Sequence, residues 1–330
     1  MKRVRLADVA EHVGVSTKTV SNVVNGTGWV SDAVRDRILI AIDELGYRPN
    51  LAARQLRQGR SGTIALCIPN LAEPYFAELA AELVDRAQER GLTVLVTQTK
   101  AKADVELAVI EAQRLPAVDG IILSPLALTA ADIEARRSEV PLLLIGELGQ
   151  TIAGDAVAHV GPDNTAAAAD ATRYLIDHGC RRIAVVGVQP HSHTETARLR
   201  LAGYRQALDE AGIGFDESLL VEVENYNRAE GTAAVESLLE RGTDFDGVFC
   251  FNDSLAFGAH FTLARHGYSQ PDQVRVIGYD AIEEGKYTVP PLASVDPGVA
   301  SASTLMLDLL ADGARGRRGH IEVPHHLVER

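Results

Sequence analysis

The sequence predicts an N-terminal all-α head with a helix-turn-helix, followed by an α/β body of two lobes with parallel, doubly wound sheets. Apolar residues at positions 6–45 recur with a helical period, whereas from Gly62 short apolar runs alternate with helical stretches. Residues 1–60 hold ten Lys and Arg against six Asp and Glu, a net charge of +4, whereas the rest hold 22 against 39, a net charge of −17. A basic head on an acidic body is expected when only the head meets phosphate.

Two short helices joined by a tight turn are predicted within residues 5–25. The first helix has an apolar stripe of Val9, Ala10 and Val13, and the second helix turns Val20, Val23 and Val24 toward it. Gly14 ends the first helix, because glycine accepts the positive φ of a helix end, and Ser16 can cap the second. The other face of the second helix carries Thr17, Lys18 and Asn22. Such short polar side chains suit the major groove of DNA; the alternative is a helical hairpin whose polar face is only hydrated.

A third helix follows the loop at 26–31, with Ser31 or Asp32 as its cap, and ends at Gly46, so the head is assigned to residues 1–46. A linker at 47–61 comes next, in which Asn50 can cap a short helix. Leu56 is flanked by arginines in this linker. It either folds against the body or enters the minor groove as an apolar wedge, with the arginines on phosphates.

The body, residues 62–330, alternates strands and helices, which indicates parallel sheets with helices on both faces. Strands are predicted at 63–68, 93–97, 120–124, 141–145, 182–188, 219–224, 247–251 and 274–278. Helices are predicted near 74–90, 103–115, 129–138, 164–178, 196–211, 227–241 and 253–265. The stretch 292–330 should add a strand, a helix and a final strand. We assign lobe one to about 62–160 with part of 292–322, and lobe two to about 161–291 with the C-terminal strand.

Other kinds of chemistry find little support in the sequence. No run of about 18 apolar residues would span a membrane, and no apolar region follows the basic N-terminus as in a signal peptide. Cys67, Cys180 and Cys250 fall in apolar runs that read as strands and are expected to be reduced core residues. His191 and His193 lack further ligands at metal-binding spacing, apart from Glu195, so a solvated loop is expected. No catalytic motif is present, and we expect no metal, no cofactor and no enzymatic activity.

The head, the linker and the order of motifs in the body resemble the LacI/GalR family of transcriptional regulators over essentially the whole chain. The most specific matches are Leu6–Ala10, Gly14–Ser16, Thr19–Ser21, Val23–Asn25 and the linker from Tyr47 through Leu56. Looser matches follow at Pro69–Asn70, Pro74–Phe76, Asp163–Asn164, Arg198, Gly203–Tyr204, Asn252–Asp253 and Gly278–Asp280. The resemblance implies a dimer on a near-palindromic DNA operator, and a body that binds a small molecule, most often a sugar, between its lobes. Closure of the lobes would then change operator affinity.

The resemblance also carries over individual DNA contacts. It places Thr17, Lys18 and Asn22 where the family reads bases, and Leu56 where a leucine opens the central base step. The residues expected at DNA are Leu6, Ser16, Thr17, Lys18, Thr19, Ser21, Asn22, Asn25, Asn50, Ala53 and Leu56.

Chemistry suited to a sugar can be sought independently where strands end at the expected cleft. Candidate partners for sugar hydroxyls are Arg198, Asn252 and Asp280; the alternative is a structural network of salt bridges and caps. Candidate aromatic surfaces for the sugar ring are Tyr75, Phe76 and Tyr226, which could instead pack in the core, as could Phe251 and Phe257. Asp163 is interpreted as the cap of the following helix, and Glu147 as a residue able to reach the cleft.

We therefore expect a cytoplasmic, sugar-responsive repressor that acts as a homodimer, because no heptad tail for a tetramer follows the last strand. One alternative is a purine- or nucleoside-responsive regulator of the same architecture, which needs a flat base between two aromatic side chains. A second is a solute-binding protein that delivers sugar to a transporter, which would need an export signal.

Overall fold

The computed structural model describes residues 4–47, 60–189, 195–313 and 317–330. The chain divides into two compact units, Met1–Ser61 and Gly62–Arg330, each of which has its own core. Among the described residues, no helix combines the length and the apolar character that crossing a bilayer requires.

The first unit contains α1 (Leu6–Val13), α2 (Thr17–Asn25) and α3 (Asp32–Glu44), which confirms the three predicted helices. Gly14, at a φ of 74°, ends α1, and the Ser16 hydroxyl caps α2 by accepting a hydrogen bond from the Thr19 N–H at 3.0 Å. The small core between the helices includes the fully buried Val9, Val20 and Ile38. One side of α2 is therefore fixed in this core, and the other side is left accessible.

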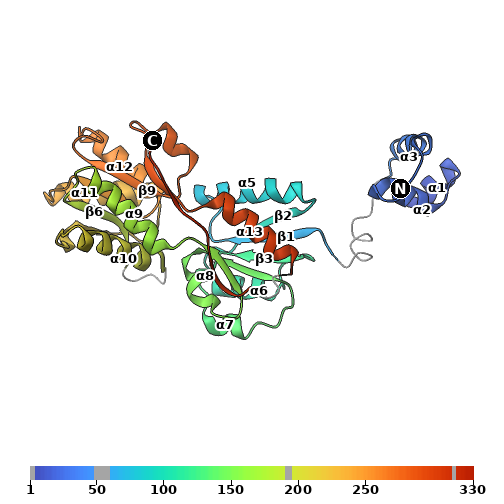
Figure 1. Ribbon diagram of the computed structural model, residues 1–330, viewed down its shortest axis with the longest axis horizontal. Coiled ribbons are helices and arrows are strands. Elements are labelled where there is room, and N and C mark those ends of the chain that lie inside the picture. Colours follow the sequence, from blue (N-terminus) through green and yellow to red (C-terminus); the bar gives the residue numbers. More distant parts are fainter. Residues whose placement is uncertain (1–3, 48–59, 190–194, 314–316) are drawn as a thin grey trace. The chain divides into compact units, whose positions relative to one another are not determined.

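Lobe one is built on a parallel sheet with the strand order β11-β5-β4-β3-β1-β2. Figure 1 labels β1, β2 and β3 of this sheet. Its strands are β1 (Thr63–Ile68), β2 (Thr93–Gln98), β3 (Gly120–Leu123), β4 (Leu142–Ile145), β5 (Ala158–Gly161) and β11 (Gly319–Glu322). Its helices are α5 (Pro74–Glu89), α6 (Ala103–Ile110), α7 (Ala130–Glu134), α8 (Gly146–Ala153) and α13 (Val299–Ala311). Helices α5 and α13 cover one face, and α6, α7 and α8 cover the other, because successive strand residues point to opposite faces.

Lobe two repeats this plan with the strand order β12-β10-β9-β8-β6-β7, in which only the pairing of β12 with β10 is antiparallel. Its strands are β6 (Ile183–Val188), β7 (Leu220–Glu222), β8 (Gly247–Cys250), β9 (Arg275–Tyr279), β10 (Ala293–Asp296) and β12 (His326–Val328). Its helices are α9 (Asn164–Asp177), α10 (Glu195–Glu210), α11 (Arg228–Glu240) and α12 (Asp253–Arg265), with 3₁₀ turns η1 (Glu217–Leu219) and η2 (Glu283–Tyr287). Helices α9 and α10 lie on one face of the sheet, and α11 and α12 lie on the other.

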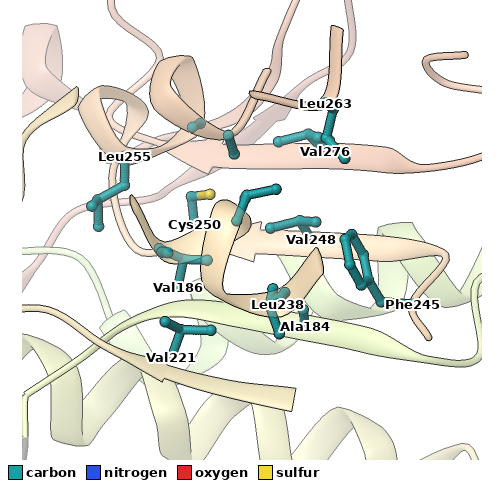
Figure 2. Packing of buried hydrophobic residues seen from close by; sticks show 14 of the residues in the cluster. Ala184, Val186, Val221, Leu238, Phe245, Val248, Cys250, Leu255, Leu263 and Val276 are labelled. Carbon is teal, nitrogen blue, oxygen red and sulfur yellow. The ribbon is translucent and has the colours of Figure 1, made fainter. Parts of the chain in front are cut away.

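The core of lobe two shows how the strands and helices are held together. Figure 2 shows Val186, Val248 and Val276 from neighbouring strands in one cluster with Leu238 of α11 and Leu255 of α12. Cys250 belongs to the same cluster. All three cysteines are buried and free, as expected of core residues, and burial raises the pKa of Cys180 to about 11.

The polypeptide passes from one lobe to the other at 161–164, 296–299 and 322–326, between β5 and α9, β10 and α13, and β11 and β12. These crossings place α13 and β11 in lobe one although they follow most of lobe two in the sequence. They also bring the carboxyl ends of the strands of both sheets toward one cleft.

Some elements differ from the prediction. Strand β5 and helix α8 were not predicted, and α6 and α7 are shorter than expected. After α13, two strands, β11 and β12, follow in place of the single final strand that was predicted. Helix α8 contains Gly146 and Gly149, and glycine is a poor helix former, so its sequence carries little helical signal. The four residues of β5 are too few to show a period.

Candidate functional site

The exposed surface of α2 is the first candidate site. Ser16, Thr17 and Lys18 are exposed at the start of the helix, and Thr19, Ser21 and Asn22 are half-buried along it. Leu6 is half-buried at the start of α1. The side chain of Asn25 is outside the described part of the chain, as are Asn50, Ala53 and Leu56 of the linker. Ser16 and Thr19 also share a hydroxyl–hydroxyl hydrogen bond of 2.8 Å, so Ser16 serves the helix cap as well as the surface.

Trp29 lies in the loop between α2 and α3 and was missed by the sequence analysis. Trp29 is 87% exposed, more than any other large apolar residue in the described part of the head. The neighbouring Gly28 approaches α2 so closely that a Cβ there would lie 2.6 Å from the side-chain nitrogen (Nδ2) of Asn22. The loop is therefore packed beside the helix that carries the predicted base-reading residues. Tryptophan is enriched at interfaces, so Trp29 is a candidate for contact with a partner.

The second candidate site is a cavity of about 460 Å³ between the lobes, lined by both. The side chains of lobe one and of α13 that line it are mainly apolar and include Tyr75, Phe76, Leu79, Ile145, Val160, Val299 and Met306. Those of lobe two are mainly polar and include Asn164, Gln189, Thr196, Arg200, Asn225, Asn227, Asn252 and Asp280, together with Tyr226 and Tyr279. A cavity with one apolar and one polar wall suits a ligand that offers both an apolar face and several hydroxyl groups.

Arg200 is the central cation of this cavity. Its Nη2 donates to the Glu147 carboxylate of lobe one at 2.7 Å, and its Nε donates to the Asn164 side chain at 3.2 Å. It also donates to the carbonyl of Phe251, and its guanidinium lies 3.5 Å from the ring centroid of Tyr279. Burial alone would lower the pKa of Arg200, but Glu147 and the other nearby groups raise it, so the charge persists.

The sequence analysis chose Arg198 as a candidate partner for sugar hydroxyls, but the structure places Arg200, and not Arg198, in the cavity wall. Arg198 is exposed, does not line the cavity, and donates to Glu195 at 2.6 Å on the outer face of α10. Residues two positions apart point to opposite sides of a helix, because each residue turns the chain by about 100°. The resemblance was therefore placed on an arginine of the exposed face of α10, two residues before the arginine of its buried face.

Asp280 and Asn252 both line the cavity, as expected. Asp280 adopts a φ of 109°, and burial raises its pKa well above the usual range although Arg200 opposes this shift. The Asn252 side chain caps α12 by accepting from the Leu255 N–H at 2.9 Å. The predicted alternative of a helix cap thus applies to Asn252, in addition to its place in the cavity wall.

The three aromatic candidates also line the cavity. Tyr75 and Phe76 of α5 contact each other edge to face, with 5.1 Å between their ring centroids. The Tyr226 hydroxyl donates to the Gly187 carbonyl at 2.8 Å. Burial raises the pKa of Tyr75 and of Tyr226. Phe251, in contrast, is fully buried in the core of lobe two.

Glu73 joins the two lobes across the cavity and was missed by the sequence analysis. Its carboxylate, at the start of α5, accepts from the Ser254 hydroxyl at 2.7 Å and from the Asn252 amide at 3.2 Å. Burial raises the pKa of Glu73, and the bond from Ser254 opposes this shift. Glu78, one turn later, accepts from the Glu283 N–H at 2.8 Å. The one signal in the sequence was a carboxylate in the loop between β1 and α5, since the partners of Glu73 lie about 180 residues away.

The remaining predictions concern single residues. Asp163 accepts from the N–H groups of Thr165 and Ala166, which makes it the cap of α9 as interpreted. His191 and His193 lie outside the described residues. Within the ranges that the structure describes, no group of three His, Cys, Asp or Glu is placed to hold a metal ion.

Two family models match the chain. The model described as bacterial regulatory proteins of the lacI family matches residues 5–50, and that described as periplasmic binding proteins and sugar binding domain of the LacI family matches residues 61–325. The chain is 34% identical to the HTH-type transcriptional regulator AscG of Escherichia coli (strain K12), over 88% of this chain and 86% of AscG.

Solved structures are similar over nearly the entire chain. The complex of the transcriptional regulator CelR with cellobiose matches with a TM-score of 0.68 and 30% identity, over 99% of each chain. The Lac repressor dimer bound to operator and the anti-inducer ONPF matches with a TM-score of 0.82 and 26% identity, over 100% of this chain and 98% of that one.

Proposed function

Because the chain belongs to the LacI family of bacterial regulatory proteins, we propose that it represses transcription by binding an operator through α2, and that a carbohydrate in the interlobe cavity controls this binding. The observation that carries the proposal is the pairing of two surfaces on one chain. A basic helical head exposes a polar helix, and an acidic two-lobed body encloses a cavity with one polar and one apolar wall. We assign the head to 1–46, the hinge linker to 47–61 and the body to 62–330.

The head supports recognition of bases in the major groove. Thr17 and Lys18 are exposed in the first turn of α2, where a recognition helix presents its side chains to base edges. We infer that Lys18 donates to a guanine edge, a contact worth about 1–3 kcal/mol of discrimination. The linker residue Leu56 is proposed to open the central base step of a near-palindromic operator bound by a homodimer.

The cavity supports a carbohydrate as effector. Arg200, Asp280 and Asn252 place charged and amide groups on one wall, where they can form paired hydrogen bonds to neighbouring hydroxyls. Tyr75 and Phe76 on the opposite wall offer apolar surface to the face of a sugar ring. The similarity to a regulator solved with cellobiose supports the same class of ligand.

Operator binding with and without a metabolite panel tests the proposal. Duplexes enriched from a random pool by the purified full chain are titrated in gel-shift experiments, with monosaccharides, disaccharides and nucleobases added in turn. We expect one enriched sequence to bind far more tightly than random duplex, and one carbohydrate to change that affinity. A response to a nucleobase alone would favour the purine alternative. Equal binding of all duplexes at physiological ionic strength would refute the repressor assignment.

A further inference from the structure

Asp280 begins a turn whose backbone is strained at two successive residues. Asp280 has a φ of 109° and Ala281 a φ of 53°, values that side-chain-bearing residues rarely adopt. Such conformations persist only when the surrounding structure holds them, and they gather at ligand sites. The turn therefore needs partners that fix its backbone groups, and these partners lie outside the cavity.

The N–H groups of Ala281 and Ile282 are held by a buried pair, whereas that of Asp280 donates to the Val295 carbonyl of β10 at 2.8 Å. The Ala281 N–H donates to the Ser294 hydroxyl of β10 at 3.0 Å, and the Ile282 N–H donates to the Asp253 carboxylate at 2.9 Å. The Ser294 hydroxyl in turn donates to Asp253 at 2.6 Å. Asp253 and Ser294 are fully buried, and neither lines the cavity.

The carbonyl groups of the same turn are held by Arg330. Its Nη2 donates to the Ala281 carbonyl at 2.8 Å, and its Nη1 donates to the Ile282 carbonyl at 3.1 Å. The rigid, planar fork of a guanidinium presents two nitrogens to two neighbouring acceptors, whereas a lysine must donate to both from a single nitrogen on a flexible chain. Gly285 leaves room for this fork, because a Cβ there would lie 2.1 Å from Arg330 Nη1.

We propose that Asp253 and Arg330 are positioning residues for effector binding: they hold the turn 280–282 from its two sides in the conformation that presents Asp280 to the cavity. The inference rests on the proposed role of Asp280 toward a carbohydrate. Burial raises the pKa of Asp253 to about 7, while Ser294, the Ile282 N–H and Arg330 lower it. Asp253 and Arg330 are therefore also linked electrostatically. We call Asp253 and Arg330 together the clamp. Asn252 and Ser254, on either side of Asp253, bind Glu73 of lobe one, so the clamp adjoins the contacts that join the lobes.

Hydrogen exchange of the full chain, followed by mass spectrometry, tests the clamp without any ligand. In Arg330→Ala and in Ser294→Ala we expect the peptide covering 280–285 to exchange at least about tenfold faster, while peptides of β1 and β3 keep their wild-type rates. Arg330→Lys should fall between Arg330→Ala and the wild type. The matched control is Arg275→Ala, at the opposite end of β9, which should leave the turn unchanged.

The same variants are compared with the wild type in a thermal-shift panel of glucose, galactose, ribose, cellobiose and lactose. The clamp predicts that the carbohydrate-induced shift of the wild type is lost in Arg330→Ala and kept in Arg275→Ala. Unchanged exchange at 280–285 overturns the clamp, and faster exchange with the shift retained overturns its role in effector binding. A wild-type chain that responds to no sugar overturns the carbohydrate proposal, and the role in effector binding with it.

Discussion

Replacing Arg200 with Met gives the most direct test of the cavity as described. The side chains of Arg200 and Glu147 are only 6% and 18% exposed, and the substitution keeps most of the side-chain volume while removing the charge. Glu147 would lose its cationic partner, and the Phe251 carbonyl would lose a donor. Because removing one partner of a buried pair leaves the other charge uncompensated, we expect Arg200→Met to lower the free energy of unfolding by about 3–5 kcal/mol.

The matched control is Arg198→Met on the same helix. Arg198 is exposed, and among the described residues its one ion pair is with Glu195, so we expect its loss to change the free energy of unfolding by less than about 0.5 kcal/mol. Urea unfolding of the full-length variants, followed by circular dichroism, measures both values. Carbohydrate-induced thermal shifts should vanish in Arg200→Met and persist in Arg198→Met. Equal stability of the two variants, or loss of the shift in Arg198→Met alone, would refute the assignment of Arg200.

Further predictions concern the pH dependence, packing and DNA contacts of the chain. Burial lowers the pKa of His159 to about 4, below its unfolded value, so its contribution to stability is complete above about pH 6.5 and is lost as the pH falls toward 4. Between pH 7 and 5 the wild type should lose about 2 kcal/mol more than His159→Gln in urea unfolding, and parallel losses would contradict this. Gly258→Ala would place a Cβ 2.2 Å from the backbone of α11 and should destabilise by about 3 kcal/mol or more, whereas Gly214→Ala, which meets open space, should not. Trp29 is the single tryptophan, so its emission should shift when random duplex is added at low salt; an unchanged spectrum despite retained binding would place it away from DNA. Lys18→Ala should weaken an enriched operator by about 1–3 kcal/mol more than random duplex, and equal weakening would make it a phosphate contact.

Local signals explain why the head was predicted closely. Gly14 and Ser16 mark a helix end and a helix start within three residues, and the valine period fixes which side of α2 is buried. The helices and strands of the body that carry long apolar runs were found for the same reason. Helix α8 and strand β5 were missed because glycines and short length leave no such period.

The cavity could be predicted only in part. Strand ends located Asn252 and Asp280, because parallel strands bring their carboxyl ends to one edge of a sheet. The choice between Arg198 and Arg200 depends on the rotation of α10 about its axis, which its neighbours in three dimensions decide. The partners of Glu73 and Arg330 come from distant segments, and no local pattern indicates such contacts.

The crossings between the lobes also bear on how the protein is made. Neither lobe is a contiguous stretch, since α13 and β11 complete lobe one only after nearly all of lobe two has left the ribosome. Until then one side of α5 lacks its covering helix and the outer edge of β5 lacks its neighbouring strand. A nascent or prematurely terminated chain therefore exposes an apolar surface prone to aggregation and an unpaired strand edge. The body, 62–330, can complete its fold only near the end of translation.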